Sequence, residues 1–427
     1  MTSHASSPPS SSTAIGRLAR AAFLFLSVST LVQGADWPGW RGPDRTGHTR
    51  AAIPATLPDN PKAAWKIPLG HGYASPILAG KTVIICDDFN NSETARALDL
   101  DSGRELWKTA YAPAWSDEFE PGPRCTPLIH GDHVFVQSAQ GRLACLRLAD
   151  GRTVWSVDFK DLGTVWSNER SSNVGAAVRR GHTGSPIVEG DHLFVQVGSL
   201  LGSSIVAFNR HSGQVVWKSL DDATAYSSPV IGTVAGTRQF ITATCEGLVG
   251  LAVTDGKLLW RVPFKTAANR NVLTPILLGD DVLFASHSTG FQSQHITRTD
   301  SGFQPVQRWF NRQLRLNLPT PVLSGSHLYG IGAAKDFICI DARSGQVAWS
   351  EKGFGDVGHV ISDGARQLVL LESGEVRLLA VNPERYEELG RFQACGKTYS
   401  QPAWTGSLLL VRDPSSLSAW PIARPGS

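Results

Sequence analysis

Ala97-Leu98-Asp99-Leu100-Asp101-Ser102-Gly103-Arg104-Glu105-Leu106-Trp107 is the stretch that decides the fold, because its pattern recurs along the chain. A small residue is followed by a polar residue, then by Ser-Gly or Asp-Gly, and finally by tryptophan. The recurrences lie at residues 145–155, 207–217, 250–260 and 339–349, and a looser copy runs through Asp300-Ser301-Gly302 to Trp309. Repetition at intervals of roughly 40 to 50 residues is typical of repeat arrays and propellers.

Each repeat also carries the signals of short β-strands. Ser or Thr precedes Pro, an apolar run follows, and a Gly-containing turn leads into a β-branched run. The dipeptides are Ser75-Pro76, Thr126-Pro127, Ser185-Pro186, Ser228-Pro229, Thr274-Pro275 and Thr320-Pro321. Because Pro is tolerated at the first position of a strand, these dipeptides mark strand starts. We predict four strands in each repeat, with the tryptophan on the fourth.

Two degenerate repeats, residues 357–392 and 399–422, end the chain, and the second is one strand short. Residues 63–67, Ala-Ala-Trp-Lys-Ile, have the pattern of the missing fourth strand. We therefore predict an all-β fold, an eight-bladed β-propeller of four-stranded blades, whose last blade is closed by an N-terminal strand. Such closure leaves only short, protected sheet edges.

The sequence divides into three predicted segments, namely a signal peptide at residues 1–34, a tether at 35–62 and the propeller at 63–427. The first contains Arg17 and Arg20, a short apolar run and the small residue Gly34, as secretory signals do. The run is about twelve residues, whereas a spanning helix needs roughly 20. No cysteine lies near Gly34. We expect export to the periplasm or the exterior, without lipid attachment or stable membrane insertion.

The tether opens with Trp37-Pro38-Gly39-Trp40-Arg41-Gly42-Pro43, which is too rich in Gly and Pro for a long helix or a central strand. We expect it to wrap the surface in an ordered way. Trp37 and Trp40 either plug a groove between blades or offer a stacking face to Arg41, Arg45 or a ligand.

The composition, with 41% hydrophobic and 18% charged residues, is that of a globular protein. The formal net charge is +3, and without Arg17 and Arg20 the chain carries 38 basic against 37 acidic residues. Such a balance gives no attraction to nucleic acid or to an anionic membrane. We expect a monomer with no nucleic-acid partner.

The repeated pattern resembles the tryptophan-docking motif of the PQQ-like (quinoprotein alcohol dehydrogenase-like) β-propeller family, over roughly residues 63–422. The Trp-Pro-x-Trp-Arg-Gly-Pro opening is similar to that of secreted bacterial members. The resemblance implies that each tryptophan stacks between neighbouring blades. The implied docking residues are Trp65, Trp107, Trp155, Trp217, Trp260, Trp309 and Trp349. The family includes PQQ- and Ca²⁺-dependent alcohol dehydrogenases and the outer-membrane assembly lipoprotein propellers.

The dehydrogenases of that family carry a pair of adjacent cysteines, a catalytic Asp, and Glu and Asn ligands to calcium. The six cysteines here stand at positions 86, 125, 145, 245, 339 and 395, so no two are adjacent, and no Cys-x-x-Cys-His occurs. We therefore expect no catalytic residues, no metal site and no PQQ, Ca²⁺ or haem. The cysteines are open to two interpretations, disulfides or buried free thiols.

We expect a non-catalytic secreted or periplasmic scaffold that binds a protein, peptide or glycan partner in the cell envelope. The alternative is a PQQ-dependent dehydrogenase-like oxidoreductase acting on an alcohol or sugar. Because the first strand of each blade lies nearest a propeller's axis, the residues just before the strand starts should converge on an axial funnel. They are His71, Tyr73, Arg124, His182, Tyr226, Asn271, Asn317 and Tyr399.

The tyrosines of this funnel suit a sugar or another polar group, since tyrosine offers both a ring face and a hydroxyl. A solvated channel is the alternative interpretation. Two long connections flank the funnel and are either binding loops or packed surface loops. Residues 109–124 offer Trp115, Asp117, Glu118 and Glu120, and residues 156–181 offer Trp166, Asn168, Glu169, Arg170, Arg179 and Arg180.

Overall fold

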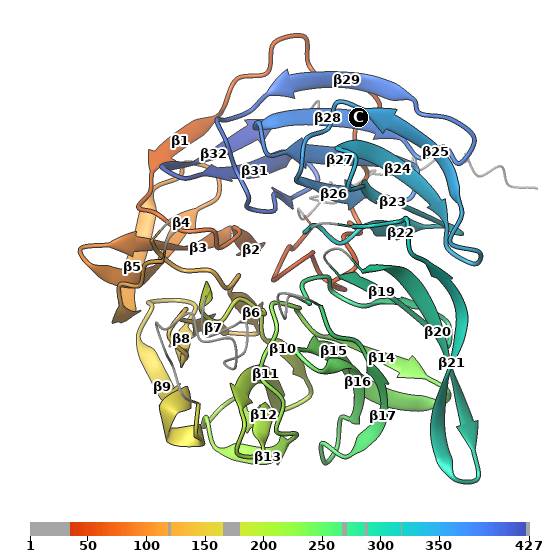
Figure 1. Ribbon diagram of the computed structural model, residues 1–427. Helices are drawn as coiled ribbons and strands as arrows, with labels where there is room; N and C mark the ends of the chain where they lie inside the picture. The colour runs from red at the N-terminus through yellow and green to blue at the C-terminus, as the bar shows by residue number, and fades with distance from the viewer. Residues whose placement is uncertain are drawn as a thin grey trace, which may run out of the picture. The chain divides into compact units, whose positions relative to one another are not determined.

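The computed structural model describes residues 35–117, 121–164, 180–266, 271–286, 289–316 and 318–423. They form eight four-stranded antiparallel sheets arranged in a ring, which is a β-propeller (Figure 1). The predicted fold is therefore confirmed. The predicted signal peptide at residues 1–34 lies outside the described residues.

Strands follow one another along the chain within each blade. The first four blades are β2 (Ile77–Ala79), β3 (Thr82–Phe89), β4 (Ser92–Asp99) and β5 (Glu105–Pro113); β6 (Leu128–His130), β7 (His133–Gln137), β8 (Arg142–Arg147) and β9 (Thr153–Asp158); β10 (Ile187–Glu189), β11 (His192–Ser199), β12 (Ser203–Asn209) and β13 (Val215–Ser219); and β14 (Val230–Val234), β15 (Thr237–Thr244), β16 (Gly247–Ala252) and β17 (Leu258–Pro263). A short 3₁₀ turn, η1 (Phe159–Leu162), follows β9.

The remaining blades repeat this order until the last. They are β18 (Ile276–Leu278), β19 (Asp281–Ser286), β20 (Gly290–Thr299) and β21 (Gly302–Asn311); β22 (Val322–Ser324), β23 (His327–Ile331), β24 (Asp336–Asp341) and β25 (Val347–Lys352); β26 (Gly358–Ser362), β27 (Arg366–Leu371), β28 (Glu375–Ala380) and β29 (Glu388–Gln393); and β30 (Ala403–Trp404), β31 (Leu408–Asp413), β32 (Ser416–Pro421) and β1 (Trp65–Pro68).

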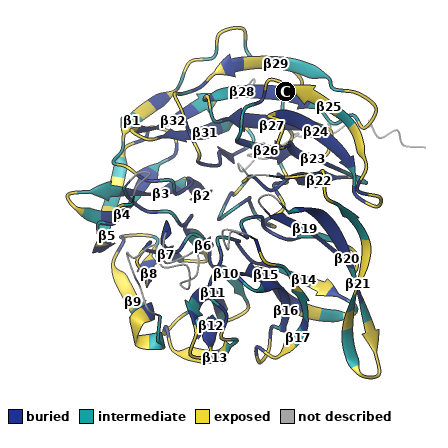
Figure 2. Ribbon diagram, viewed as in Figure 1, coloured by how far each residue is buried: buried dark blue, intermediate teal, exposed yellow. Residues whose placement is uncertain are grey.

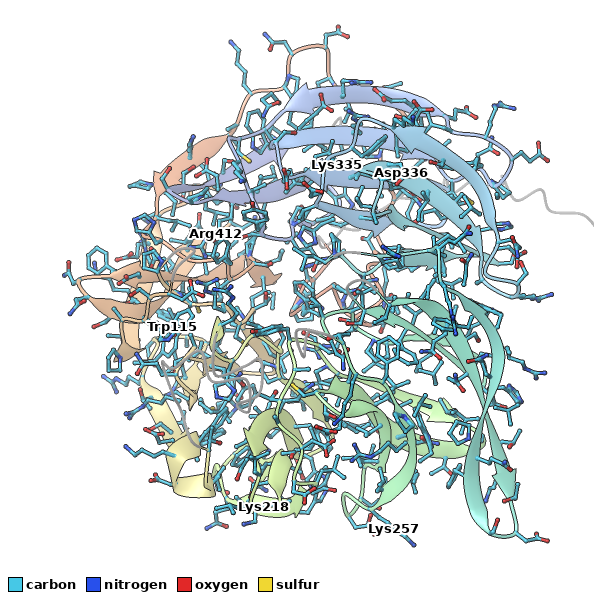
Figure 3. All side chains as sticks on the ribbon, in the orientation of Figure 1. Trp115, Lys218, Lys257, Lys335, Asp336 and Arg412 are labelled. Atoms are coloured by element: carbon cyan, nitrogen blue, oxygen red, sulfur yellow. The ribbon has the colours of Figure 1, made fainter. Side chains whose placement is uncertain are left out.

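Strand β1 closes the eighth blade, as the sequence predicted. It pairs antiparallel with β32, with Trp65 opposite Ala419 and Ile67 opposite Leu417. A buried arginine of β31, Arg412, crosses the same seam into the first blade (Figure 3). Its Nη1 donates to the carbonyls of Ala74 at 2.8 Å and Cys86 at 2.6 Å. Both ends of the described propeller are thus joined by a strand pair and by a buried side chain.

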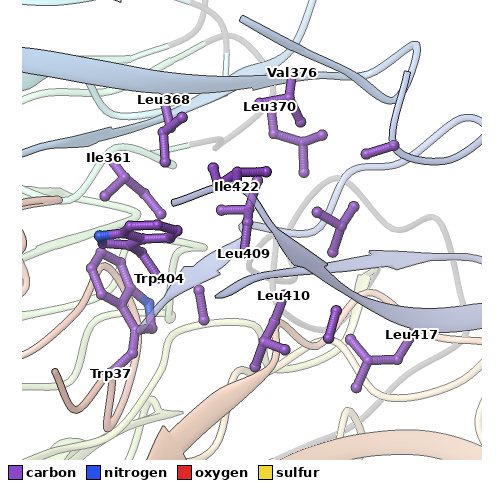
Figure 4. Close-up of a cluster of buried hydrophobic side chains, with 14 of the residues drawn as sticks. Trp37, Ile361, Leu368, Leu370, Val376, Trp404, Leu409, Leu410, Leu417 and Ile422 are labelled. Carbon is purple, nitrogen blue, oxygen red and sulfur yellow. The ribbon is translucent and has the colours of Figure 1, made fainter. Parts of the chain in front are cut away.

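The core lies between neighbouring blades, because the middle strands of each sheet bury both faces. Strands β7, β12 and β27 are almost wholly buried, whereas the outer strands β5, β9 and β25 alternate or are largely exposed (Figure 2). One cluster of buried side chains joins the last blade to the N-terminal segment, with Trp37 beside Trp404 (Figure 4). Removing this apolar surface from water drives the packing of the blades.

The recurring glycine and tryptophan meet across the blade boundaries. The Trp107 indole donates from Nε1 to the carbonyl of Leu148 in the next blade, at 2.8 Å. A Cβ on Gly151, whose φ is +72°, would lie 2.4 Å from that indole. Only glycine tolerates both the backbone conformation and the approach of the ring. The same contact pairs Trp65 with Gly103, Trp155 with Gly213, Trp217 with Gly256 and Trp309 with Gly345.

Trp260 differs from the other docking tryptophans in its hydrogen bond and in the glycine that its ring covers. Its Nε1 donates to Gln239 Oε1 of its own blade, at 2.6 Å. Its indole lies over its strand partner Gly250, where a Cβ would come within 2.3 Å. In the other blades that carry the tryptophan, alanine, cysteine or serine stands at this position. In the following blade, a Cβ on Gly302 would meet no described atom within 4 Å. Trp260 therefore lies over its own strand partner, in a buried cluster that includes Val282, Phe284 and Ile296 of the next blade, rather than on the hairpin glycine of that blade.

The hydroxyls of the Ser/Thr-Pro dipeptides join neighbouring blades at the strand starts. The backbone N–H of Ser75 donates to Thr126 Oγ1 at 3.2 Å, and that of Ser185 donates to Ser228 Oγ at 3.0 Å. The same link runs from Thr274 N to Thr320 Oγ1 and from Gln401 N to Ser75 Oγ. The repeated hydroxyl is thus explained by a hydrogen bond across the blade boundary.

The N-terminal segment reaches the axis instead of wrapping the surface as expected. Trp37, Arg41 and Arg45 are all less than 10% exposed, and the chain of this segment runs through the middle of the ring (Figure 1). We call residues 37–49 the plug. The expectation was wrong because the repeats supply carbonyl oxygens around the axis, and the two arginines of the plug satisfy them.

All six cysteines lie in the described ranges and are free thiols, five of them buried. This settles the choice left open by the sequence in favour of thiols. Within the described residues, no helix has the length and apolar character needed to cross a membrane.

Candidate binding site at the axial mouth

A cavity of about 400 Å³ opens where the first strands of the blades begin. Every one of the eight blades contributes to its wall, and the plug contributes Trp40. The lining residues are Trp40, Tyr73, Arg124, Thr126, Arg180, Thr183, Tyr226, Ser228, Val272, Leu318, Val357, His359 and Tyr399. Such convergence follows from propeller geometry, because the innermost strands all start at the same end of the ring.

The structure brings together four of the eight residues predicted for the funnel. Tyr73, Arg124, Tyr226 and Tyr399 line the cavity. His71 is exposed and does not line it. Asn317 lies outside the described residues. The binding role of the four remains a prediction.

His182 and Asn271 are buried and do not line the cavity, so the predicted funnel has to be corrected at both positions. Asn271 Nδ2 donates to the carbonyl of Thr244 at 2.7 Å and to that of Phe264 at 3.1 Å. The His182 ring packs edge-on against Phe159, with the ring centres 5.0 Å apart. Burial lowers the pKa of His182 to about 4, which keeps it neutral at physiological pH. Asn271 thus turns inward to hydrogen-bond two carbonyls, and His182 turns inward to pack against Phe159.

Arg124 is held in a fixed orientation at the edge of the cavity. Its guanidinium lies 4.6 Å from the ring centre of Tyr73 and 4.9 Å from that of Trp115, so it packs between two aromatic rings. Its Nη2 donates to Asp117 Oδ1 at 2.8 Å. Trp115 therefore does not line the cavity itself but packs against Arg124. It lies on the side of the first blade, where Figure 3 labels it.

Arg180 shares the same carboxylate. Its Nη1 lies 3.3 Å from Asp117 Oδ2, and the Arg124, Arg180 and Asp117 side chains are each about 10% exposed or less. The two guanidinium groups thus share one largely buried carboxylate. Ion pairs that are largely removed from water are screened only weakly by salt.

His359 and Tyr399 line the cavity at the seventh and eighth blades. The His359 Nε2 lies 2.9 Å from the carbonyl of Tyr399. Burial lowers the pKa of His359 to about 4, so the imidazole is neutral and donates this hydrogen bond from Nε2. The Tyr399 ring meets the Tyr73 ring edge-on, with the centres 5.7 Å apart. The two tyrosines thus extend one aromatic wall across the closure seam.

Trp40 connects the cavity to the plug. Its Nε1 donates to Thr274 Oγ1 at 3.0 Å, and its indole meets His359 edge-on at 6.2 Å between ring centres. The next residue, Arg41, donates to the carbonyls of Thr320 and Pro321. Trp40 is therefore held by the hydrogen bond of its own indole and by the anchoring of the residue that follows it.

Sequence reasoning missed His359, because its degenerate blade lacks the Ser/Thr-Pro dipeptide. Aligning Gly358 with the starts of the other first strands would have placed His359 near the axis. Arg180 was named as a loop residue, and Trp40 was named only as a possible stacking platform. The remaining residues named on the two long connections, Glu118, Glu120, Trp166, Asn168, Glu169, Arg170 and Arg179, lie outside the described residues.

The described residues do not fit a calcium–quinone site. Calcium prefers several oxygen ligands, above all carboxylates. The described lining of the cavity contains no Asp or Glu side chain. Elsewhere in the described ranges, no three His, Cys, Asp or Glu side chains are grouped so that they could hold a metal ion.

An eight-bladed ring with tryptophan docking and strand starts around an axial cavity is the architecture of a PQQ-like propeller. Residues 91–351 match the sequence model of one family of such propellers, described as outer membrane protein assembly factor BamB. The match covers more than half of the chain, so the protein belongs to this family.

Comparison with individual proteins agrees with this assignment. The chain is 23% identical over 336 residues to the outer membrane protein assembly factor BamB of Yersinia pestis, covering 75% of this chain and 78% of that protein. Two further relatives of the same name, from Alkalilimnicola ehrlichii and Shewanella oneidensis, are matched over 41% and 60% of their lengths.

Two solved structures share the fold. The crystal structure of BamB from Moraxella catarrhalis superposes with a TM-score of 0.57 at 15% identity, covering 86% of this chain and 99% of that one. A quinohemoprotein alcohol dehydrogenase from Pseudomonas putida HK5 superposes with a TM-score of 0.61 at 12% identity, covering 92% and 81%. At such low identities the likeness concerns the fold alone.

Proposed function

We propose that this protein is a non-catalytic scaffold of the cell envelope that binds a protein, peptide or glycan partner at its axial mouth. One observation carries the proposal: all eight blades and the plug converge on a single cavity of about 400 Å³. That volume lies in the range of about 300–1,000 Å³ that is usual for ligand sites. Membership of the BamB family supports an envelope role.

The proposal includes export. The basic start, the short apolar run and Gly34 favour cleavage between Gly34 and Ala35 and release to the periplasm or the exterior. Intact mass spectrometry of the exported protein should give the mass of residues 35–427. Retention of residues 1–34 in the exported, folded protein contradicts this part of the proposal.

We also propose that the protein works without PQQ or calcium. The sequence has no adjacent cysteine pair, and the described cavity wall offers no carboxylate ligand. Incubation with PQQ and Ca²⁺ should therefore produce no reduction of an acceptor dye with alcohols or sugars. Turnover at an ordinary enzyme rate, about 1–10³ per second, would instead establish the dehydrogenase alternative.

The binding proposal is tested by comparing how much partner is recovered by a variant of the cavity and by a variant of a distant surface. Immobilised protein is incubated with an envelope extract, and the recovered material is quantified for the wild type and for Tyr226→Ala with Tyr399→Ala. The matched control is Val347→Ala on the outer strand β25, where the side chain is 44% exposed. We expect the double variant to lose the partner while its circular dichroism spectrum is unchanged. Equal recovery by all three proteins moves the site to another surface.

A further inference from the structure

A second cavity, of about 410 Å³, lies at the opposite end of the first strands from the axial mouth. Its wall consists mainly of plug residues and of the first strands of the second, third and fourth blades. It includes His130 and Glu189, where β6 and β10 end, whereas the axial mouth is lined by residues near the strand starts. The two cavities have no described lining residue in common, so they are separate candidate sites.

The main chain of the plug pairs with the first strands of some blades and leaves others bare. Trp37 and Leu78 of β2 exchange two main-chain hydrogen bonds, with N to O distances of 3.0 and 2.9 Å. In the second blade, the N–H of Ile129 on β6 donates to the Pro38 carbonyl at 2.7 Å. In the third blade, no described main-chain group of the plug pairs with β10. The axial edge of β10 is therefore left open beside the second cavity.

Val188 presents the main-chain groups of this open edge. It is the second residue after the proline, as Leu78 and Ile129 are in their blades, and it lines the second cavity. It precedes Glu189, which pairs with His192 across a two-residue turn. Residues that flank such a turn hydrogen-bond to each other, and the next residue along points its N–H and C=O away from the partner strand. Val188 therefore directs both groups toward the axis, where they have no hydrogen-bond partner among the described residues.

Apolar side chains lie on both sides of this edge. Val188 packs with Leu128 of the second blade in one cluster, and Ile187 packs with Ile231 of the fourth blade in another. Successive side chains of a strand point to opposite faces of its sheet. A strand added beside β10 would therefore direct its side chains alternately toward these two clusters, and apolar side chains would fit both.

The charged side chains of the same wall are already paired. Arg238 Nε donates to Glu189 Oε1 at 2.7 Å. Arg45 Nη1 donates to the carbonyl of Pro229, and Asp44 Oδ1 accepts from Arg50 Nη2 at 3.1 Å. Recognition through the main chain of β10 is therefore favoured over recognition of a charged ligand.

We infer that the second cavity binds an extended, apolar peptide segment of a partner protein, which adds a strand to β10 through the N–H and C=O of Val188. The plug indicates this occupant, because its own extended residue Trp37 makes the same exchange with the equivalent residue Leu78. Strand addition of this kind takes its affinity from main-chain hydrogen bonds and its specificity from alternate side chains. The site is separate from the axial mouth and does not depend on the function proposed there.

The test measures binding of the fluorescein-labelled peptide Val-Thr-Val-Thr-Val, amidated at its C-terminus, by fluorescence polarisation. The wild type should bind it saturably. The same peptide N-methylated at every residue should bind about tenfold more weakly, because it has lost its main-chain donors.

A variant of the protein tests the same contact from the other side. Val188→Pro removes the N–H that faces the cavity and should weaken peptide binding by a similar factor. The control is Leu277→Pro, the same change at the equivalent position of the fifth blade, which does not line the cavity. Proline is tolerated on an edge strand where its missing N–H had no partner. Thermal unfolding checks that both variants are folded, and the N-methylated peptide tests the wild type in any case.

The inference is overturned if the wild type shows no saturable binding, or if the N-methylated peptide binds as tightly as the unmodified one. It is also overturned if Val188→Pro weakens binding no more than Leu277→Pro does. The Tyr226→Ala, Tyr399→Ala variant of the axial mouth should keep the affinity of the wild type for the peptide. Loss of peptide binding in that variant, with binding retained by Val188→Pro, would place the peptide at the axial mouth, so this inference would fail while the proposed function stands.

Discussion

Arg45 donates from Nη1 to the carbonyl of Pro229 at 2.8 Å, and from Nη2 to that of Ser185 at 3.2 Å. One side chain of the plug thus holds the first strands of the third and fourth blades together. Arg41 binds the start of the sixth blade through the Pro321 carbonyl. Burial lowers the pKa of Arg45 to about 9, so at neutral pH the guanidinium remains charged and donates fully. The plug therefore links several blades by hydrogen bonds from inside the ring.

The substitution Arg45→Ala should destabilise the propeller. It leaves several buried carbonyls around the axis without a donor, and a hydrogen bond to a charged group contributes about 1.5–3 kcal/mol. We expect a loss of at least that size in the free energy of unfolding, measured by urea denaturation. The control is Arg50→Ala, whose side chain is 75% exposed and pairs with exposed Asp44. A change in Arg45→Ala no larger than in this control would show that the plug does not support the ring.

The substitution Gly151→Ala should be costly because of the neighbouring indole. The added Cβ would lie 2.4 Å from the Trp107 ring. The matched control is Gly131→Ala in the same blade, where φ is +60° and no atom lies within 4 Å of the added Cβ. Both variants carry the strain of a positive φ, so their difference isolates the clash, which we expect to cost about 1–3 kcal/mol. Equal melting temperatures would show that the ring moves aside freely.

The blades were predictable from sequence because one glycine–tryptophan contact repeats at five of the blade boundaries. Gly151 and Trp107 are constrained by each other, so their spacing is visible without a structure, and so is the hydroxyl at Ser75 that binds across a blade boundary. Trp260 was not predictable from this motif, since its packing depends on Gly250 and on the long hairpin of the following blade. Local spacing could not reveal that difference.

The axial site could be predicted only in part. Tyr73 and Tyr399 follow from their positions before strand starts, and both line the cavity. His182 occupies an equivalent position but turns inward to pack against Phe159. The direction of a side chain at a strand start depends on the neighbouring loop, and these loops are not part of the repeated sequence pattern. The plug was missed for a similar reason, because its arginines bind carbonyl groups that carry no sequence signal.

The substitution Trp217→Ala should cost about 3–5 kcal/mol in the free energy of unfolding, the usual loss when a buried tryptophan is truncated. Trp217 is 8% exposed, and its Nε1 donates to the carbonyl of Val253 in the next blade at 3.1 Å. The adjacent Val216 is 46% exposed, and Val216→Ala should change stability by less than about 0.5 kcal/mol. A cost below about 1 kcal/mol for Trp217→Ala would be incompatible with its docked position.

Glu93 on β4 is wholly buried, and its carboxyl accepts a hydrogen bond from the Ala139 N–H at 3.2 Å. Burial raises the pKa of Glu93 from its ordinary value of 4.5 to about 8. Between these two values the folded state binds a proton that the unfolded state has released. Its contribution to stability is therefore fully present below pH 4.5 and is lost as the pH rises through 8.

The substitution Glu93→Gln removes this titration while keeping an oxygen for the Ala139 N–H. The variant should gain stability relative to the wild type as the pH rises from about 4.5 to 8, by up to roughly 1.4 kcal/mol per pH unit. Buried His182 titrates in both proteins, so its effect cancels in the difference. The same substitution at the exposed Glu351, Glu351→Gln, is the control for replacing a carboxylate by an amide. Urea unfolding at pH 5, 6.5 and 8 measures both, and a flat difference for Glu93→Gln would mean that Glu93 is ionised in the folded protein throughout this range.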